Sequence, residues 1–193
     1  MPGIVDQLQE LAGNLEQLAG VQVRSQVMEG IENIKAGTDR TDVALWIKGA
    51  MERLDALIGE PAGRRVMERC GMSCARVNGR VVQQIASRRR QHQTVDSFLE
   101  AEQRKPMPGT RLVRKGNTLH QFFTPRSFRR PMRCYCALLR SLPEGETVSP
   151  TYCHCSTGFL KTLWEAALER PVTVELIRSA VSGAEECEFS IRF

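Results

Sequence analysis

The stretch Cys134-Tyr135-Cys136 is followed, after sixteen residues, by Cys153-His154-Cys155. These two Cys-x-Cys pairs hold four of the chain's seven cysteines. In an extended strand, residues two apart point to the same face, so each pair would aim both sulfurs one way. The segment Leu142-Pro143-Glu144-Gly145-Glu146 between the pairs favours a turn. The stretch therefore predicts a hairpin, with strands over 133–141 and 147–153, that gathers four thiols.

Four clustered thiols are the ligand set of a structural zinc site, so we expect zinc to be bound by Cys134, Cys136, Cys153 and Cys155. The Cys-x-Cys spacing is tighter than the usual zinc spacing, and alternatives therefore stay open. One is a set of reduced thiols packed as small apolar side chains. The others are an iron–sulfur cluster and a thiol-dependent hydrolase or sulfur-handling enzyme that uses the same cysteines.

The front of the chain predicts helices. Apolar residues recur at spacings of three and four over 3–35, with an interruption at Gly20, and again over 41–57 and 61–75. A further helical region covers 76–104, with a break near 91–93. Cys70 and Cys74 lie four residues apart in the helix over 61–75, so both sulfurs share one helical face. These two cysteines are further candidate metal ligands.

The periodicity changes after Lys105-Pro106-Met107-Pro108-Gly109, which marks a boundary. Short strands are predicted over 110–114 and 118–123, a helix over 157–169, and two more strands over 172–179 and 187–192. The expected fold class is therefore α+β, with an N-terminal helical region (1–105) and a cysteine-rich domain of a small antiparallel sheet and a packed C-terminal helix (106–193).

The charge is unevenly distributed over the chain. Residues 61–133 carry seventeen Lys and Arg against four acidic side chains, although the whole chain has a net charge of only +5. Arg126, Arg129 and Arg130 flank Phe128 in a predicted loop, which favours an anionic small ligand. Without a recognition helix or an RNA-binding signature beside it, this loop does not favour nucleic acid.

Other features bear on location. We find no apolar run of the roughly 18 residues that a membrane span needs, and no signal peptide at the N-terminus. An odd number of cysteines is typical of a reducing compartment, so we expect a cytoplasmic protein.

The C-terminal third resembles the end of the 4-vinyl reductase domain, which is related to the Bet3-type subunits of vesicle tethers. The resemblance rests on Gly158-Phe159-Leu160-Lys161, Pro171-Val172-Thr173-Val174-Glu175 and Cys187-Glu188-Phe189-Ser190-Ile191. With Cys70-Gly71 and Tyr152-Cys153-His154-Cys155, the chain also resembles L-2-amino-thiazoline-4-carboxylate hydrolase-like proteins. The resemblance implies a compact α+β domain, often a homodimer, with cysteines near a cavity for a small molecule.

Overall fold

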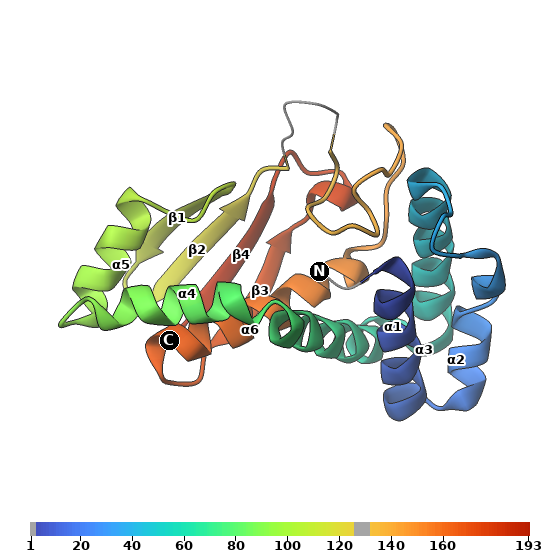
Figure 1. Cartoon of the computed structure of the whole chain (residues 1–193), viewed down its shortest axis with the longest axis horizontal. Coiled ribbons are helices and arrows are strands. Elements are labelled where there is room, and N and C mark those ends of the chain that lie inside the picture. The colour runs from blue at the N-terminus through green and yellow to red at the C-terminus, as the bar shows by residue number, and fades with distance from the viewer. Residues whose placement is uncertain (1–2, 126–131) are drawn as a thin grey trace.

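The computed structural model describes residues 3–125 and 132–193 as a helical half joined to a half built around a sheet (Figure 1). The α-helices are α1 (Ile4–Ala19), α2 (Val21–Val27), α3 (Arg40–Val77), α4 (Gly79–Arg90), α5 (Val95–Arg104) and α6 (His154–Leu168). The strands are β1 (Thr110–Lys115), β2 (Thr118–Phe123), β3 (Thr173–Arg178) and β4 (Cys187–Arg192). Three short 3-10 helices are η1 (Ile31–Asn33), η2 (Pro150–Cys153) and η3 (Ala180–Ser182). The prediction of an α+β fold with a helical front and a small antiparallel sheet is confirmed.

The helices follow the apolar periodicity of the sequence. In α1, Ile4, Leu8, Leu11 and Leu15 recur on one face and are buried. The two helices predicted over 41–57 and 61–75 form one element, α3, which is kinked at Gly59 with a φ of 69°. Glycine adopts this left-handed conformation without strain, so the chain changes direction there and continues as helix.

The sheet has the strand order β1-β2-β4-β3, and every pair of neighbours is antiparallel. Leu119, Phe189 and Ile191 alternate with more polar residues and are fully buried. They belong to the same core as Leu163 and Trp164 of α6. The indole of Trp164 donates a buried hydrogen bond of 2.8 Å to Oε1 of Gln121 on β2, which ties α6 to the sheet.

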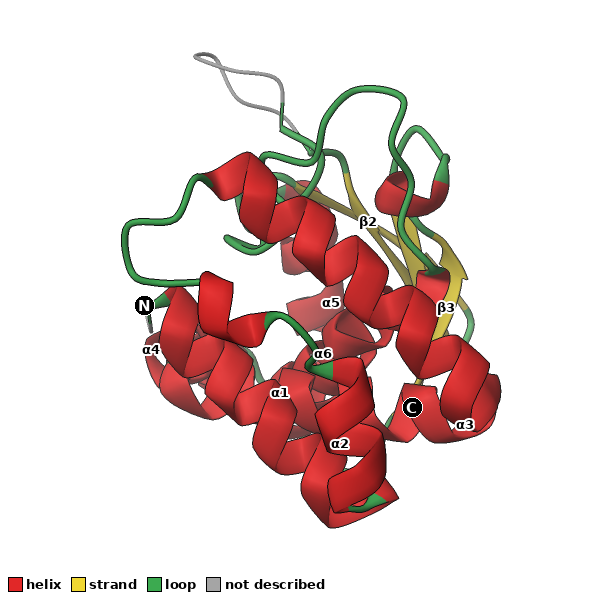
Figure 2. Ribbon diagram, turned by 90° about the vertical axis from the view of Figure 1, so that its right-hand side faces the viewer, coloured by secondary structure: helices red, strands yellow, loops and turns green. Residues whose placement is uncertain are grey.

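Helices α3 and α6 cross in direct backbone contact (Figure 2). A Cβ atom on Gly71 would overlap the carbonyl oxygen of Cys155, and one on Gly158 would overlap that of Glu68. Glycine at both positions is what permits this approach. The crossing brings Cys70 and Cys74 of α3 close to the start of α6.

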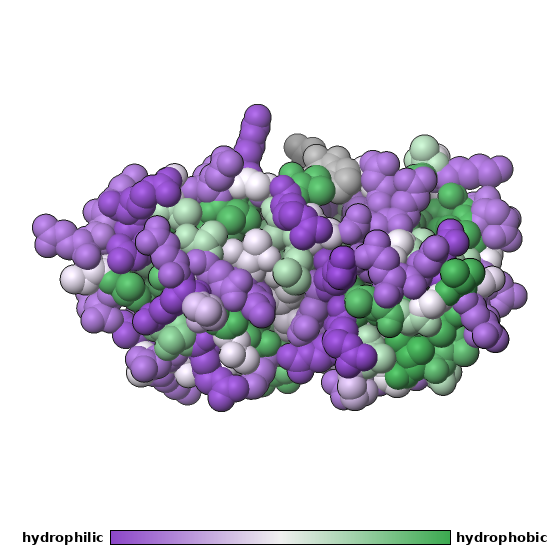
Figure 3. All heavy atoms as spheres, turned by 90° about the horizontal axis from the view of Figure 1, so that it is seen from below, coloured by the Kyte–Doolittle hydropathy of each residue, from purple (hydrophilic) through white to green (hydrophobic). Residues whose placement is uncertain are grey.

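The molecule has two apolar cores. One joins α1 and α3 to the segment 138–153, and the other joins α4, α5 and α6 to the sheet. Seen from below, the surface is mostly hydrophilic, with apolar atoms gathered over the helical half (Figure 3). Among the described helices, we find none that is long and apolar enough to cross a membrane.

The hairpin predicted between the two cysteine pairs is wrong. Residues 133–141 form bends and turns, and 150–153 form the 3-10 helix η2. Ser149 caps η2 by accepting a hydrogen bond from the N–H of Thr151, and Pro150 suits a first helical position. The guanidinium of Arg133 donates to the carbonyls of Pro143 and Glu146, both at 3.2 Å, and so holds the loop without a strand partner.

Candidate functional site

A cavity of about 190 Å³, here called the sulfur cavity, lies between the loop at 134–136, the start of α6, the end of β2 and the start of β4. Its wall includes five cysteines from four parts of the chain: Cys134, Cys136, Cys153, Cys155 and Cys187. The other described residues of the wall are apolar, aromatic or uncharged: Pro108, Phe123, Pro125, Tyr135, Tyr152, Ser156, Val181 and Phe189. Among the described residues that line it, none carries a charged side chain.

A second cavity of about 200 Å³, here called the α1–α3 cavity, lies between these two helices and the loop before α6. Cys70 and Cys74 line it together with Leu11, Ile47, Met67 and Leu138. Asp6 and Glu10 of α1 also line it, and both are exposed residues. The two cavities share Cys136, Tyr152 and Cys155. Together they are lined by all seven cysteines of the chain.

Burial favours the neutral form of several thiols in these cavities. Burial raises the pKa of Cys70 and Cys153 to about 12. Burial also raises the pKa of Cys134 and Cys155 well above the usual range, and the neighbouring cysteines add to this effect. The pKa of Cys187 is raised by burial as well. A thiolate is the reactive form of cysteine, so these thiols are poor nucleophiles.

Hydrogen bonds hold several of the sulfurs in place. The sulfur of Cys136 lies 3.1 Å from the Tyr152 hydroxyl and 3.9 Å from Oε1 of Gln7, to which it donates. The sulfur of Cys153 lies 2.9 Å from the hydroxyl of Ser179. These contacts link the loop before α6 to α1 and to the end of β3.

The prediction of a zinc site is wrong, and an iron–sulfur cluster fails for the same reason. Within residues 3–125 and 132–193, no group of three or more His, Cys, Asp or Glu side chains is arranged to hold a metal ion. Cys153 ends η2 and Cys155 lies in the first turn of α6, so the pair is helical where an extended strand was expected. Residues two apart in a helix do not share a face, so this pair lacks the common direction that a strand would have given its sulfurs.

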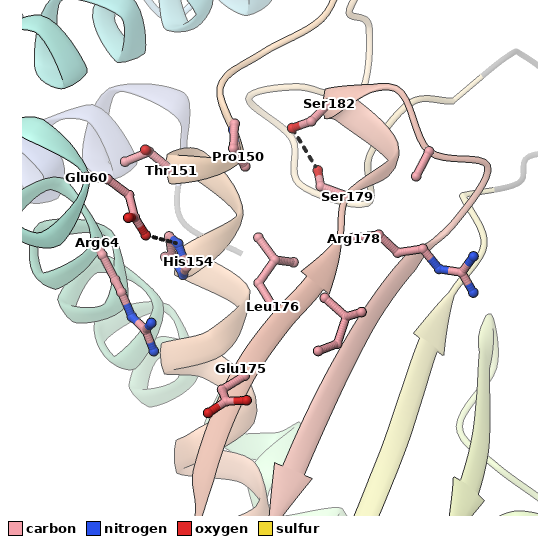
Figure 4. A pocket seen from close by; sticks show the side chains of 12 residues that line it. Glu60, Arg64, Pro150, Thr151, His154, Glu175, Leu176, Arg178, Ser179 and Ser182 are labelled. Carbon is pink, nitrogen blue, oxygen red and sulfur yellow. Dashed lines mark hydrogen bonds and ion pairs between the residues drawn. The ribbon is translucent and has the colours of Figure 1, made fainter.

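His154, between these cysteines, lines a different and more open cleft of about 590 Å³ (Figure 4). Its Nε2 lies 4.0 Å from a carboxylate oxygen of Glu60. Burial, and then the charge of Arg64, lowers the pKa of His154. Arg64 is paired with Glu68 at 2.8 Å, and Arg178, at the other side of the cleft, is paired with Glu188 at 3.0 Å. Because these arginines already have partners, the cleft is a weaker candidate than the two thiol-lined cavities.

The other sequence predictions concern the ligand's charge, the homodimer and the division of the chain. The basic segment with Arg126, Phe128, Arg129 and Arg130 lies outside the described residues. The preference for an anionic ligand rested on this segment, and the described wall of the sulfur cavity supplies no cationic group in its support. The homodimer and the division of the chain at residue 105 stay predictions.

Sequence reasoning missed two residues of the site. Cys187 alternates with Phe189 and Ile191 along β4, a pattern typical of a core residue, yet it lines the sulfur cavity. Tyr152 was not singled out, although it is 3% exposed and lines both cavities. Its proximity to Cys136 depends on how the loop between them folds, for which the sequence gives no signal.

The chain belongs to a family of unknown function (DUF6144), whose model matches residues 4–192. No curated protein matches it. Among solved structures, it is similar to an H-NOX protein from S. oneidensis in the Fe(II) ligation state, with a TM-score of 0.50, 14% identity, and coverage of 100% of this chain and 95% of that chain. An H-NOX protein mutant from K. algicida, in the unliganded Fe(II) state, gives a TM-score of 0.49 with 14% identity. The match covers 96% of this chain and 94% of that chain.

These findings overturn the resemblance to the 4-vinyl reductase domain and the hydrolase-like proteins. The family match spans nearly the whole chain, and the fold is similar to that of an H-NOX protein from S. oneidensis. The motifs behind the resemblance are a Gly at a helix crossing, one helix face and one alternating strand, and such features recur in unrelated folds. The likeness to H-NOX proteins concerns the fold alone. No histidine is among the described residues that line the two thiol-lined cavities, and the described cysteines there are not arranged to hold a metal ion.

Proposed function

We propose that this protein is a binding or sensing domain for a small, uncharged, largely apolar molecule, which it holds in the sulfur cavity. The observation that carries the proposal is that every cysteine of the chain lines this cavity or the adjoining one, with no charged group on the described wall of the sulfur cavity. Small-molecule sites are typically concave and mostly apolar, with a few polar groups that fix orientation.

The chemistry of the wall supports an uncharged ligand. Burial raises the pKa of Cys134, Cys153 and Cys155 and so keeps these thiols neutral. The rings of Phe123 and Phe189 meet edge to face at 5.9 Å beside them. Sulfur is polarizable and makes favourable contacts with aromatic rings. A charged ligand would lose its hydration here and gain no ionic partner, which costs several kcal/mol or more. We therefore propose an uncharged ligand in place of the anionic ligand that the basic residues of 61–133 suggested.

The same observations weigh against a thiol-dependent hydrolase or sulfur-handling enzyme. A nucleophilic cysteine needs a lowered pKa, from a neighbouring cation, a base or a helix N-terminus. Burial raises the pKa of Cys134, Cys153 and Cys155 instead. Seven free thiols persist best in a reducing compartment, so we place the protein in the cytoplasm.

Titration with benzene tests the proposal, because apolar cavities of about 150 Å³ bind benzene in water. Binding is followed by NMR chemical shifts of methyl groups, and we expect the largest changes at Val181 in the cavity wall. Cys187→Phe fills the cavity and should weaken binding more than about tenfold, a loss of roughly 1.4 kcal/mol. Leu18→Phe, at a half-exposed position on α1, is the control that keeps wild-type affinity. If the chemical shifts of the methyl groups in the cavity wall do not change at saturating benzene, the proposal is refuted.

A further inference from the structure

The phenol of Tyr152 is a buried polar group that lies at the boundary between the two thiol-lined cavities. It is one of three residues that line both of them, with Cys136 and Cys155. The side chain comes from η2, which Ser149 and Pro150 hold in place. A fixed hydroxyl at the boundary of two largely apolar spaces can orient an apolar ligand by one hydrogen bond.

The hydrogen bond that Tyr152 makes is a weak one. Its hydroxyl lies 3.1 Å from the sulfur of Cys136, and that thiol in turn donates to Oε1 of Gln7. Either atom of the Tyr152–Cys136 pair can be the donor, and when the thiol donates to Gln7, Tyr152 donates to the sulfur. Sulfur is a weak acceptor, so a strong buried donor is held by a poor partner. Burial raises the pKa of Tyr152 well above its usual range, so the phenol keeps its proton.

We propose that the ligand is an elongated, uncharged molecule with a carbonyl-type oxygen in its middle, which accepts a hydrogen bond from Tyr152 while its two apolar arms occupy the sulfur cavity and the α1–α3 cavity. The inference rests on the proposed function, since it assigns the chemical class of ligand for the same site. The two cavities, of about 190 and 200 Å³, are nearly equal in size, so arms of similar length fit them. A carbonyl oxygen is a better acceptor than the Cys136 sulfur, so exchanging one for the other is favourable.

The test uses nonan-5-one and its isostere 5-methylidenenonane, which replaces the carbonyl oxygen by a CH₂ group. Both have two butyl arms, and Kd is measured by NMR titration against wild type, Tyr152→Phe and Tyr135→Phe. Tyr135 lines only the sulfur cavity, and its hydroxyl donates to the carbonyl of Thr124, so its variant is the matched control. We expect Tyr152→Phe to weaken binding of the ketone about three- to tenfold. It should change binding of the alkene by less than about twofold, and Tyr135→Phe should change the affinities for the ketone and the alkene by equal factors.

Three outcomes would overturn the inference. The first is an equal effect of Tyr152→Phe on the ketone and the alkene, and the second is the same ketone-specific loss in Tyr135→Phe. The third is failure of the ketone to bind wild type. Benzene binding, measured in parallel, separates this result from failure of the proposed function. If benzene occupies the sulfur cavity, only the inference is lost, and if benzene does not bind either, both are lost.

Discussion

Gly71 of α3 lies directly against the backbone of Cys155 in α6, so that a Cβ atom on Gly71 would overlap the Cys155 carbonyl oxygen. This contact sets the distance between the two helices, and with it the position of Cys70 and Cys74 relative to the cysteines of the α6 region. The site thus depends on a packing feature of the fold as well as on the cysteines themselves.

Gly71→Ala should lower the free energy of unfolding by about 3 kcal/mol, because a backbone carbonyl cannot move aside as a flexible side chain can. Urea denaturation measures the change. Gly13→Ala is the control, because a Cβ atom at Gly13 in α1 has open space around it. That variant should gain roughly 0.5–1 kcal/mol from higher helix propensity. Equal stabilities for wild type and Gly71→Ala would mean that the helices do not cross in contact at this point.

Trp164→Phe should destabilise the protein by roughly 2–4 kcal/mol, the combined cost of a smaller core side chain and a lost buried hydrogen bond. The indole N–H is the donor to Gln121 Oε1, and the Nε2 of that amide has no partner within the described chain. Thermal unfolding followed by circular dichroism measures the effect. Trp46→Phe serves as the comparison, since the Trp46 N–H bond to Glu29 is exposed to water, and its loss should cost less. A larger loss at Trp46 would contradict this account.

Stability should fall as the pH rises above about 9. Cys70 and Cys153 have pKa values near 9.0 in the unfolded chain and about 12 in the folded protein. Between these values the unfolded chain binds fewer protons than the folded one, so the free energy of unfolding decreases with pH. Each such thiol contributes a slope of up to about 1.4 kcal/mol per pH unit.

Urea denaturation at pH 8 and pH 10 measures this slope. The double variant Cys70→Ala/Cys153→Ala should show a smaller decrease between the two pH values than wild type, whatever its stability at pH 8. An identical decrease in the two proteins would show that these thiols are not protected from ionisation by folding.

The cysteines should differ in reactivity toward a thiol reagent under native conditions. Cys74 is the exposed one, whereas Cys153 is 5% exposed and hydrogen-bonded to Ser179. With Ellman's reagent at pH 8, we expect Cys74 to react first and Cys153 only as the protein unfolds. Cys74→Ser should remove the fast phase and Cys153→Ser should not. Fast reaction of all seven thiols in the native protein would contradict a buried cluster.

The sequence predicted the helices and the four strands well, because both carry clear apolar periodicity. Val95–Arg104 and Cys187–Arg192 lie close to where the pattern placed them. The sequence prediction failed between the cysteine pairs, where strands were expected over 133–141 and 147–153. Local turn chemistry decided that segment, with Ser149 capping η2 and α6 starting at His154, three residues before its expected first residue.

The candidate site was found in part. The cysteines that the sequence singled out do line adjoining cavities, but the metal expected among them is not supported by their arrangement. Cys187 and Tyr152 complete the site through contacts between distant segments, such as that of Tyr152 with Cys136, which no local pattern encodes. Likewise, the closeness of Cys70 to Cys155 follows from the crossing of α3 and α6 at Gly71, and a lone glycine in a helix does not reveal its neighbour.

The central claim is that an apolar, ligand-accessible cavity lies among Cys134, Cys136, Cys153, Cys155 and Cys187. A crystal structure determined under xenon pressure tests it most directly, because xenon enters dry apolar cavities of this size. We predict xenon bound within the sulfur cavity, in contact with these sulfurs and with Phe189. A cavity filled by ordered water, or collapsed with no xenon present, would contradict the claim.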